Sequence, residues 1–375
     1  MRKVVIVLGT RPEAIKLLPV YLALRKARVN TMLVSTGQHK QMLLPIFDFF
    51  RVKPDHDMRV MTENQSLDTL TAQLLQKCSQ LFKDEAPGLV IVQGDTTTAM
   101  AAALSAFYLR IPVAHVEAGL RSYDHYAPFP EEVNRRSIGL VAALHFTPTS
   151  SATKAVRLEH LPGRIHQVGN TVIDSLQFAL KTIKKYSAAL ETQYAPVLGN
   201  FERTVLITGH RRENFGSGFI NICDAIRALA HAFPSVSWVY PVHMNPNVHD
   251  VVKQRLDGLP NVFLIAPVPY DHMVFLMSRS YLILTDSGGI QEEAPALGKP
   301  VIVMRNVTER PEGVKAGCCI LAGNSRTKIV ATARMLLNDK VRYSRMAKAK
   351  SPYGKGDSAQ RIARVVKAFL GTSQA

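Results

Sequence analysis

The chain has 375 residues, of which 47% are hydrophobic and 20% charged, a composition that excludes a long disordered or collagen-like protein. Two domains of similar size are expected, because a single hydrophobic core rarely grows beyond about 250–300 residues. The formal net charge of +17 raises the question of a nucleic-acid partner.

The first apolar run, Val4 to Leu8, is too short for a signal peptide and continues directly into Gly9-Thr-Arg-Pro12, which predicts a strand followed by a helix start. The best later candidate for a bilayer span, residues 99–116, is interrupted by Arg110 and Pro112. We therefore expect a cytoplasmic protein without a membrane partner.

Short β-branched runs recur along the whole chain, each followed by a turn and a longer amphipathic stretch, which predicts βα units on a parallel sheet. The strands predicted in the first half are Lys3–Leu8, Thr31–Thr36, Leu89–Gln93, Pro112–Val116, Leu144–Phe146 and Ile165–Val168. Those predicted in the second half are Thr204–Thr208, Val236–Tyr240, Val262–Ile265, Tyr281–Leu284, Val301–Met304 and Cys319–Leu321. The predicted fold class is α/β, with two doubly wound, Rossmann-like domains that face a cleft.

The predicted domains cover residues 1–180 and 200–350. The segment between them, residues 180–200, is polar and has Pro196 and Gly199 near its end, as expected for a helix that leads into a linker. A last amphipathic stretch, residues 358–372, predicts a C-terminal helix that fits either domain, including a role in completing the first one.

Polar side chains follow the predicted strands of the first domain, where the ligands of open parallel sheets bind. Arg11 and Lys16 stand at the helix start after the first strand, a position that attracts anions. Asp95 and Glu117 follow the third and fourth strands.

A later loop adds two neighbouring acids, Glu131 and Glu132. A lone acid at a strand-to-helix turn is usually a helix cap or a partner of the helix dipole. Three acids at such positions in one domain favour proton-transfer chemistry, and Glu131 is the predicted functional member of its pair.

The second domain carries His210 directly after its first strand, accompanied by Arg211 and Arg212, which suits an anion-facing role. His243 follows the next strand and fits a structural role as well as a functional one.

The strongest local signal is the segment from Thr285 to Gly289, where a strand ends and a helix begins. Gly288 and Gly289 let the backbone approach a phosphate, and Ser287 adds a hydroxyl donor. Glu293, one helical turn further on, suits a ribose diol, and Arg310 supplies a cation. The segment is predicted to hold the phosphates of a nucleotide.

No Gly-x-Gly-x-x-Gly follows the first strand, and no Gly-x-x-x-x-Gly-Lys-Ser/Thr is present, so the nucleotide is predicted to be part of the substrate and not a cofactor. The four cysteines lack the spacing of a zinc site, so no metal is expected either.

The segment 325–367 contains twelve Lys or Arg residues against Asp339 and Asp357. These basic residues alternate with apolar ones at helical spacing, which favours solvated helix faces over a nucleic-acid site. Aromatic residues do not interleave with them, as they do in many single-strand binders.

Together these segments closely resemble the bacterial non-hydrolysing UDP-N-acetylglucosamine 2-epimerases, in order from residue 3 to about residue 362. The motifs that carry the resemblance are Gly9-Thr-Arg-Pro-Glu-Ala-Ile-Lys16, Gln93-Gly-Asp-Thr-Thr97, His115-Val-Glu-Ala-Gly-Leu-Arg121, Pro130-Glu-Glu-x-Asn-Arg135, Gly169-Asn-Thr-Val-Ile-Asp174, His210-Arg-Arg-Glu-Asn214, Thr285-Asp-Ser-Gly-Gly-x-Gln-Glu-Glu-Ala-Pro295 and Thr308-Glu-Arg-Pro-Glu312.

The resemblance implies a GT-B architecture, a homodimer, and interconversion of UDP-GlcNAc and UDP-ManNAc through elimination of UDP to a 2-acetamidoglucal, which would supply ManNAc-type sugars for cell-surface polysaccharide. It implies that Asp95, Glu117 and Glu131 transfer protons and that His210 lies near the leaving phosphate. The residues that it assigns to UDP are Arg11, Lys16, Ser287, Gly288, Gly289, Glu293 and Arg310.

Gln38, His39 and Gln41 resemble the place where some bacterial members bind a second UDP-GlcNAc as an allosteric activator, with His243 as a further contact. Two positions depart from the family pattern: Lys355 stands in the tail motif where an aspartate is usual, and Met273 replaces an aromatic residue near the uracil. An epimerase of a modified UDP-sugar, such as a UDP-diacetamido uronic acid, and a GT-B glycosyltransferase are the alternative functions.

Overall fold

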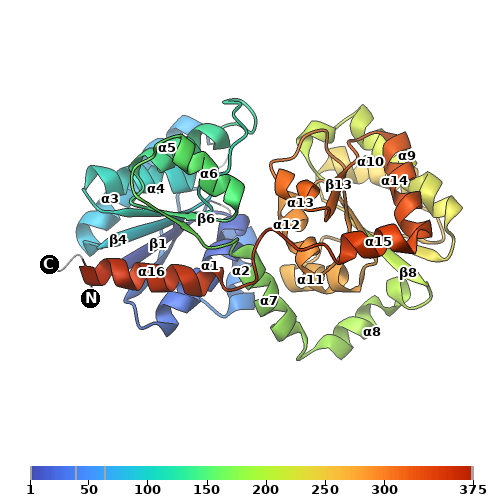
Figure 1. The fold of residues 1–375 in the computed structure, drawn as a ribbon, viewed down its shortest axis with the longest axis horizontal. Coiled ribbons are helices and arrows are strands. Elements are labelled where there is room, and N and C mark those ends of the chain that lie inside the picture. Colours follow the sequence, from blue (N-terminus) through green and yellow to red (C-terminus); the bar gives the residue numbers. More distant parts are fainter. Residues whose placement is uncertain (1, 39, 63–64, 373–375) are drawn as a thin grey trace. The chain divides into compact units, whose positions relative to one another are not determined.

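The computed structural model describes residues 2–38, 40–62 and 65–372 (Figure 1). The chain divides into two compact units. Unit 1 comprises residues 1–175 and 353–375, and unit 2 comprises residues 176–352. Each unit has its own parallel sheet with helices around it. This is the predicted α/β class with two Rossmann-like domains.

The sheet of unit 1 has seven strands in the order β3-β2-β1-β4-β5-β6-β7, all parallel. The strands are β1 (Val4–Leu8), β2 (Thr31–Ser35), β3 (His56–Asp57), β4 (Leu89–Gln93), β5 (Val113–Val116), β6 (Leu144–Thr147) and β7 (Arg164–Gln167). The six strands predicted here are confirmed. The short edge strand β3 was missed, because it has no apolar run and is defined only by its pairing with β2.

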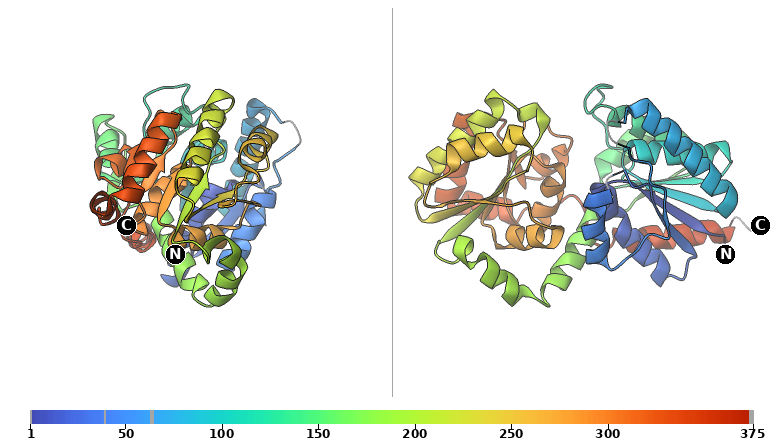
Figure 2. Two further views of the ribbon diagram at one scale, coloured as in Figure 1. Left: turned by 90° about the vertical axis from the view of Figure 1, so that its right-hand side faces the viewer. Right: turned by 180° about the vertical axis from the view of Figure 1, so that it is seen from behind.

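The helices of this half are α1 (Arg11–Lys26), α2 (Lys40–Phe50), α3 (Leu67–Glu85), α4 (Thr97–Tyr108), α5 (Glu131–Val141), α6 (Ser150–Leu158) and α7 (Val172–Ile183), and the chain returns at its end with α16 (Ser358–Thr372). Helices α3, α4 and α5 pack side by side on one face of the sheet, and α1 and α16 lie together on the other (Figure 2). Buried valines of β1 and β4 and the apolar faces of α3 and α4 form one core of this unit.

The sheet of unit 2 has six parallel strands in the order β10-β9-β8-β11-β12-β13. The strands are β8 (Arg203–Thr208), β9 (Val236–Pro241), β10 (Val262–Ile265), β11 (Leu282–Thr285), β12 (Val301–Val303) and β13 (Cys319–Leu321), so all six predicted strands are confirmed. The helices are α8 (Ser187–Leu198), the short 3₁₀ helix η1 (Arg212–Asn214), α9 (Ser217–Ala232), α10 (Pro246–Leu256), α11 (Tyr270–Arg279), α12 (Gly288–Ala296), α13 (Pro311–Lys315), α14 (Arg326–Asn338) and α15 (Lys340–Ala347). Trp238, Tyr240 and Phe219 are the largest side chains of its core.

The two sheets share the feature that positions ligands in this class of fold. In each, the strand order reverses beside the first strand of the unit: β1 lies between β2 and β4, and β8 lies between β9 and β11. Loops after such neighbouring strands separate in opposite directions and leave a crevice at the carboxyl edge. The segments after β1 and β4 begin with Gly9 and Gly94, and those after β8 and β11 begin with Gly209 and Asp286.

The polar segment between the predicted domains is more ordered than a linker. Helix α7 crosses from unit 1 into unit 2, and α8 continues through Pro196. The last helix, α16, belongs to unit 1, where it contacts α1. Within the described ranges, no helix is both long and apolar enough to cross a bilayer.

Candidate active site

The loop between β1 and α1 is organised by the buried carboxylate of Glu13. Its Oε2 accepts hydrogen bonds from the backbone N–H groups of Gly9 (3.0 Å) and Thr10 (2.7 Å) and from the Thr10 hydroxyl (2.8 Å). Its Oε1 accepts from the hydroxyl of Thr96 (2.7 Å), in the loop after β4. Burial raises the pKa of Glu13 to about 6, although these hydrogen bonds oppose the increase. Glu13 therefore ties together the two loops that carry Arg11 and Asp95.

Glu117 follows β5 and pairs with Lys16 of α1. The Lys16 Nζ lies 2.5 Å from Glu117 Oε1, and both side chains are nearly inaccessible, with exposed fractions of 8% and 6%. The side-chain amides of Asn170 and Gln93 also donate to the carboxylate. Glu117 has a φ of 65°, a left-handed conformation that is rare for glutamate and that tends to occur at functional sites. Lys16, expected to contact UDP, is thus engaged with the carboxylate expected to transfer protons.

Asp95 is held by the amino-terminal half of α5. Arg135 donates to Asp95 Oδ2 through Nε (3.0 Å) and through its terminal NH2 group, and Asn134 donates to the Asp95 carbonyl (2.9 Å). The Asp95 side chain keeps an exposed fraction of 24%. The sequence placed Arg135 in a motif but gave it no role, although its i, i+3 spacing from the acid Glu132 indicated a pairing.

The neighbouring acids Glu131 and Glu132 have different surroundings. Glu132 is fully buried and accepts from the N–H groups of Ser122 (3.0 Å) and Tyr123 (3.2 Å), which makes it a structural residue. Glu131 is the first residue of α5 and is half-buried. It lies one helical turn before Asn134 and Arg135, the residues that contact Asp95.

In unit 2, the end of β11 is joined to the loop after β8. The Asp286 Oδ2 accepts from the N–H groups of His210 (2.9 Å) and Arg211 (2.9 Å) and from the Asn214 side chain (3.3 Å). His210 itself is exposed, and its ring stacks on that of His243, with centroids 5.3 Å apart and planes at 16°. His243, which the resemblance linked to an activator, is therefore a direct neighbour of His210.

The predicted phosphate segment leads into α12, with Ser287 as its N-cap. A side chain at Gly288 would place its Cβ 3.3 Å from the Cζ of Arg310, so this glycine makes room for the guanidinium beside the amino end of the helix. Arg310 Nε donates to Glu292 Oε1 (2.8 Å). Glu293 is buried and accepts from the Tyr270 hydroxyl (2.7 Å). A helix amino terminus and a cation at one place suit a phosphate.

A chain of alternating charges runs through three motifs of this unit. Arg305 pairs with Glu213 (2.5 Å) and with Glu309 (2.8 Å), and Glu309 approaches Arg310 (3.5 Å). Burial alone would raise the pKa of Glu309, but the hydrogen bond from Arg305 and the charges of Arg310 and Arg305 lower it to about 2. Arg305 was not selected from the sequence, because it lies in an irregular segment between β12 and α13, where spacing along the chain does not indicate which charges pair.

The residues linked to the activator have different places. Gln38 is half-buried after β2 and accepts a hydrogen bond from Thr98 (2.9 Å), whereas Gln41 is exposed on α2. His39 lies outside the described residues, and His243 belongs to the other unit.

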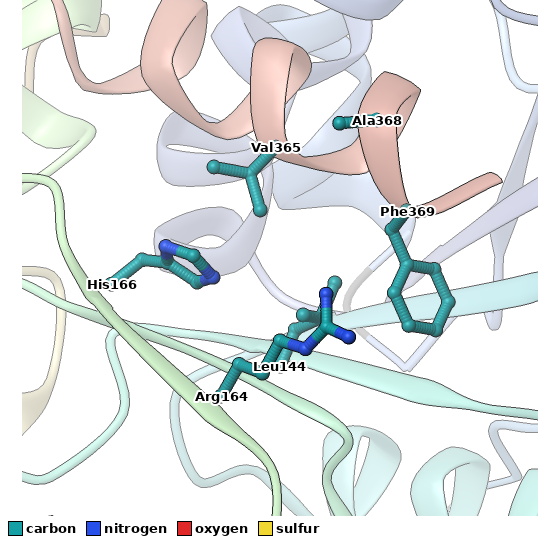
Figure 3. A pocket seen from close by; sticks show the side chains of 6 residues that line it. All are labelled: Leu144, Arg164, His166, Val365, Ala368 and Phe369. Atoms are coloured by element: carbon teal, nitrogen blue, oxygen red, sulfur yellow. The ribbon is translucent and has the colours of Figure 1, made fainter. Parts of the chain in front are cut away.

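A cavity of about 160 Å³ lies between α16 and the strands β6 and β7 (Figure 3). Its lining includes Leu144 and Arg164, the first residues of their strands, and none of the predicted site residues. It therefore begins at the amino edge of the sheet, opposite the edge at which this class of fold binds ligands. Among the described residues, no group of three or more His, Cys, Asp or Glu side chains is arranged to hold a metal ion.

Comparison with known proteins identifies the family. A family model described as UDP-N-acetylglucosamine 2-epimerase matches residues 22–367. The chain belongs to this family. This UDP-N-acetylglucosamine 2-epimerase family is the one that the motifs indicated, and its isomerase class is the predicted class of enzyme.

Relatives in this epimerase family match the chain over nearly its whole length. It is 44% identical to the UDP-N-acetylglucosamine 2-epimerase of Campylobacter jejuni, over 98% of this chain and 97% of the relative. It is also 44% identical to that of Escherichia coli K12, over 97% of this chain and 98% of the relative.

Solved structures agree. The UDP-GlcNAc 2-epimerase from Neisseria meningitidis bound to UDP-GlcNAc has a TM-score of 0.93 at 42% identity, covering 98% of this chain and all of that one. The enzyme from Methanocaldococcus jannaschii in complex with UDP-GlcNAc and UDP has a TM-score of 0.84 at 32% identity, covering 98% and 99% of the two chains. A glycotransferase of kitacinnamycin, at 12% identity and a TM-score of 0.66, shares the fold alone.

Proposed function

We propose that this protein interconverts UDP-GlcNAc and UDP-ManNAc. The observation that carries the proposal is the full-length match to epimerases, one of them solved with UDP-GlcNAc bound, in a chain that keeps acids at the strand ends of unit 1. The nucleotide-binding features of unit 2 support it: the amino end of α12, Arg310 and the buried Glu293.

The chemistry follows from the substrate. The C2 hydrogen is not acidic, because C1 is an acetal carbon and no neighbouring carbonyl stabilises a carbanion. Removal of the C2 proton by a carboxylate while the C1–O bond breaks avoids this difficulty, since the electron pair forms a C1–C2 double bond and UDP leaves as an anion. Delivery of a proton to the other face of C2 and return of UDP to C1 give the epimer. No redox cofactor takes part in this route.

In this proposal Asp95, Glu117 and Glu131 transfer protons, and His210 stabilises the departing phosphate. Arg135 orients Asp95, and Lys16 holds Glu117. The UDP contacts are assigned to Arg11, Lys16, Ser287, Gly288, Gly289, Glu293 and Arg310. Lys16 can bind UDP while it stays paired with Glu117, because its ammonium has three N–H donors.

Proton NMR in D2O tests the reaction. Incubation with UDP-GlcNAc and no NAD should replace the C2 proton by deuterium and produce UDP-ManNAc signals. Asp95→Asn should abolish both while UDP binding, measured by calorimetry, stays within about threefold of wild type, because an acid that only transfers protons adds little ground-state affinity. If the wild-type enzyme shows neither exchange nor epimer, the function is refuted. If the variant loses UDP binding as well, the role of Asp95 is wrong.

We further propose that the enzyme is a cytoplasmic homodimer that serves polysaccharide synthesis. Exposed apolar side chains at the carboxyl ends of the adjacent helices α4 and α5, Phe107 (52%), Tyr108 (68%) and Leu140 (64%), support an interface there. Light scattering after gel filtration should give twice the monomer mass. A monomer at micromolar concentration would contradict the proposal.

We also propose that a second UDP-GlcNAc activates the enzyme at a site that includes Gln38, Gln41, His39 and His243. The stacking of His243 on His210 supports a link between this site and the leaving phosphate. Added UDP-GlcNAc should accelerate the reverse reaction of wild type. The same acceleration in Gln38→Ala would remove Gln38 from the site.

A further inference from the structure

Asp286, in the middle of the predicted phosphate segment, does not present its charge to solvent. Its side chain is fully buried at the end of β11. A buried carboxylate is costly unless hydrogen bonds compensate for the water that it loses. Three donors meet its Oδ2: the N–H groups of His210 and Arg211, both at 2.9 Å, and the Asn214 side chain at 3.3 Å. Asp286 therefore fastens the loop after β8 to the end of β11.

The second carboxylate oxygen points to a more specific role. Oδ1 has no hydrogen-bond partner among the residues that the structure describes, and it lies 3.9 Å from the Nδ1 of His210. Catalytic hydrogen bonds are often long in unliganded enzymes and shorten when substrate binds. A ring movement of about 1 Å would bring the two atoms within hydrogen-bond distance.

Several contacts restrict where the imidazole can move. The ring of His243 stacks against that of His210. The Tyr240 hydroxyl donates to the carbonyl of Gly209 (3.0 Å), and the hydroxyls of Thr208 and Thr285 are 2.6 Å apart. The N–H of Arg211 donates to Asp286 (2.9 Å), so the backbone is held on both sides of His210, and the stack on His243 covers one face of its ring.

We propose that Asp286 is a positioning residue that acts through His210: it fixes the imidazole and keeps a proton on Nδ1, so that Nε2 is the nitrogen that takes up a second proton and donates it in a hydrogen bond to the leaving phosphate of the proposed reaction. The logic is that of a carboxylate that orients a catalytic histidine and sets its tautomer. The inference rests on the proposed function for the identity of the phosphate, but the geometry of the pair does not depend on it.

The tautomer can be measured without turnover. In protein labelled with ¹⁵N-histidine, at a pH where the ring is neutral, the His210 signals, assigned by their loss in His210→Gln, should show the proton on Nδ1. In Asp286→Asn the amide can donate to Nδ1, so the proton should move to Nε2. A wild-type ring protonated on Nε2, or a tautomer unchanged in the variant, overturns the proposal. If Asp286→Asn does not fold, the wild-type measurement alone decides.

A double-mutant cycle tests the route of action. Asp286→Asn should lower kcat at least about 100-fold with KM within about threefold, because an amide that donates to Nδ1 opposes the doubly protonated ring that the leaving phosphate requires. The variant that combines it with His210→Gln should be no slower than His210→Gln alone. Losses that multiply, or an effect confined to KM, overturn the proposal. If wild type has no epimerase activity, the proposed function fails, and the tautomer measurement still tests the pair.

Asp224→Asn is the matched control. Asp224 on α9 pairs with Arg255 on α10 at 2.7 Å, in the same unit but apart from the loop after β8. The Asp224→Asn enzyme loses the same negative charge as Asp286→Asn. Its kcat should stay within about twofold of wild type, because ion pairs near the surface contribute little. If kcat falls as far in Asp224→Asn as in Asp286→Asn, then loss of any negative charge from unit 2 lowers kcat, and the specific role of Asp286 is overturned.

Discussion

At the scale of single residues, the site is built from charges that neutralise one another over long separations in sequence. Lys16 and Glu117 form a nearly inaccessible pair, whereas Lys3 and Glu85 form one whose side chains keep exposed fractions of 31% and 28%. When one partner of a buried ion pair is removed, the other charge stays away from water. When one partner of a more exposed pair is removed, water solvates the remaining charge. The two pairs therefore differ in how much the loss of one partner destabilises the protein, although both join a lysine to a glutamate.

This difference predicts the stability of two matched variants. Glu117→Gln should reduce the free energy of unfolding by roughly 3 kcal/mol, because it removes one charge of an ion pair that is nearly inaccessible to water. Glu85→Gln should cost less than about 1 kcal/mol. Urea denaturation followed by circular dichroism measures both. Combination of Glu117→Gln with Lys16→Met should restore part of the loss, and similar costs for the two single variants would contradict the argument.

At the scale of elements, turns and helix ends set the position of the functional loops. Gly119, two residues after Glu117, has a φ of 90°, and a Cβ added there would lie 2.3 Å from the carbonyl oxygen of Ala152 in α6. Gly216, at the start of α9, also has a positive φ (77°), but a Cβ there would meet nothing within 4 Å. The first glycine is required by conformation and by space, the second by conformation alone.

The two alanine variants should separate these effects. Gly216→Ala should lower the free energy of unfolding by about 1–3 kcal/mol, the cost of a backbone conformation (φ 77°, ψ −130°) that glycine adopts far more readily than other residues. Gly119→Ala should lower it by roughly 2–5 kcal/mol, because the backbone of α6 must also shift. Urea denaturation of both gives the comparison. Equal losses would mean that the turn after β5 adjusts without strain.

The carboxyl-terminal helix is attached through a buried acid. Asp174 accepts from the N–H groups of Ser358 (3.2 Å) and Ala359 (2.9 Å) at the start of α16. Burial raises the pKa of Asp174 to about 6, although these hydrogen bonds oppose the increase. The folded protein therefore binds this proton more tightly than the unfolded chain, whose aspartates have a pKa near 3.9. The stability that protonation provides is complete below about pH 4 and is lost as the pH rises through about 6.

Asp174→Asn should remove this pH dependence. Between pH 4 and pH 7, the free energy of unfolding of wild type should fall relative to that of the variant by roughly 2–3 kcal/mol, the equivalent of the change in pKa. Parallel urea titrations at several pH values measure the difference, in which the other titrating groups cancel. A constant difference would show that folding does not raise the pKa of Asp174. A difference that grows in favour of wild type as the pH rises would show that folding lowers it.

At the scale of the whole molecule, the positive charge is spread over separate parts of the chain. All twelve basic side chains between residues 325 and 367 are exposed, as predicted for solvated helix faces. Those of α14 and α15 belong to unit 2, and those of α16 belong to unit 1. The apolar positions between them, such as Ile329 and Ile362, are fully buried in their own units. The basic residues that follow one another in the sequence are thus divided between the surface of unit 2 and the surface of unit 1.

We therefore predict only weak, salt-sensitive binding of nucleic acid. Fluorescence anisotropy with a 20-base-pair DNA duplex at 150 mM NaCl should give a dissociation constant no tighter than about 10 µM, in the range of non-specific binding. The affinity should fall steeply as salt rises, because released counterions are its main source. Submicromolar binding at this salt concentration would restore nucleic acid as a partner.

Local pattern determined much of this protein. Apolar runs between turns located twelve strands, and residues such as Asp95 and His210 were selected because they follow those strands. Strand ends are a local property, and an open parallel sheet gathers them at one edge whatever the strand order. Strand β3 escaped because two polar residues carry no pattern of their own and exist as a strand only through β2.

The tertiary structure alone decided which residues meet. Asp95 with Arg135, Lys16 with Glu117, and Asp286 with the loop of His210 lie far apart in sequence and come together because of the order of strands in each sheet. Periodicity shows which face of an element is buried, but not which element covers it. For this reason the sequence by itself determined the family and the edge of each sheet that carries the chemistry. The structure decided that Asp286, which lies inside the predicted phosphate segment, holds the loop of His210.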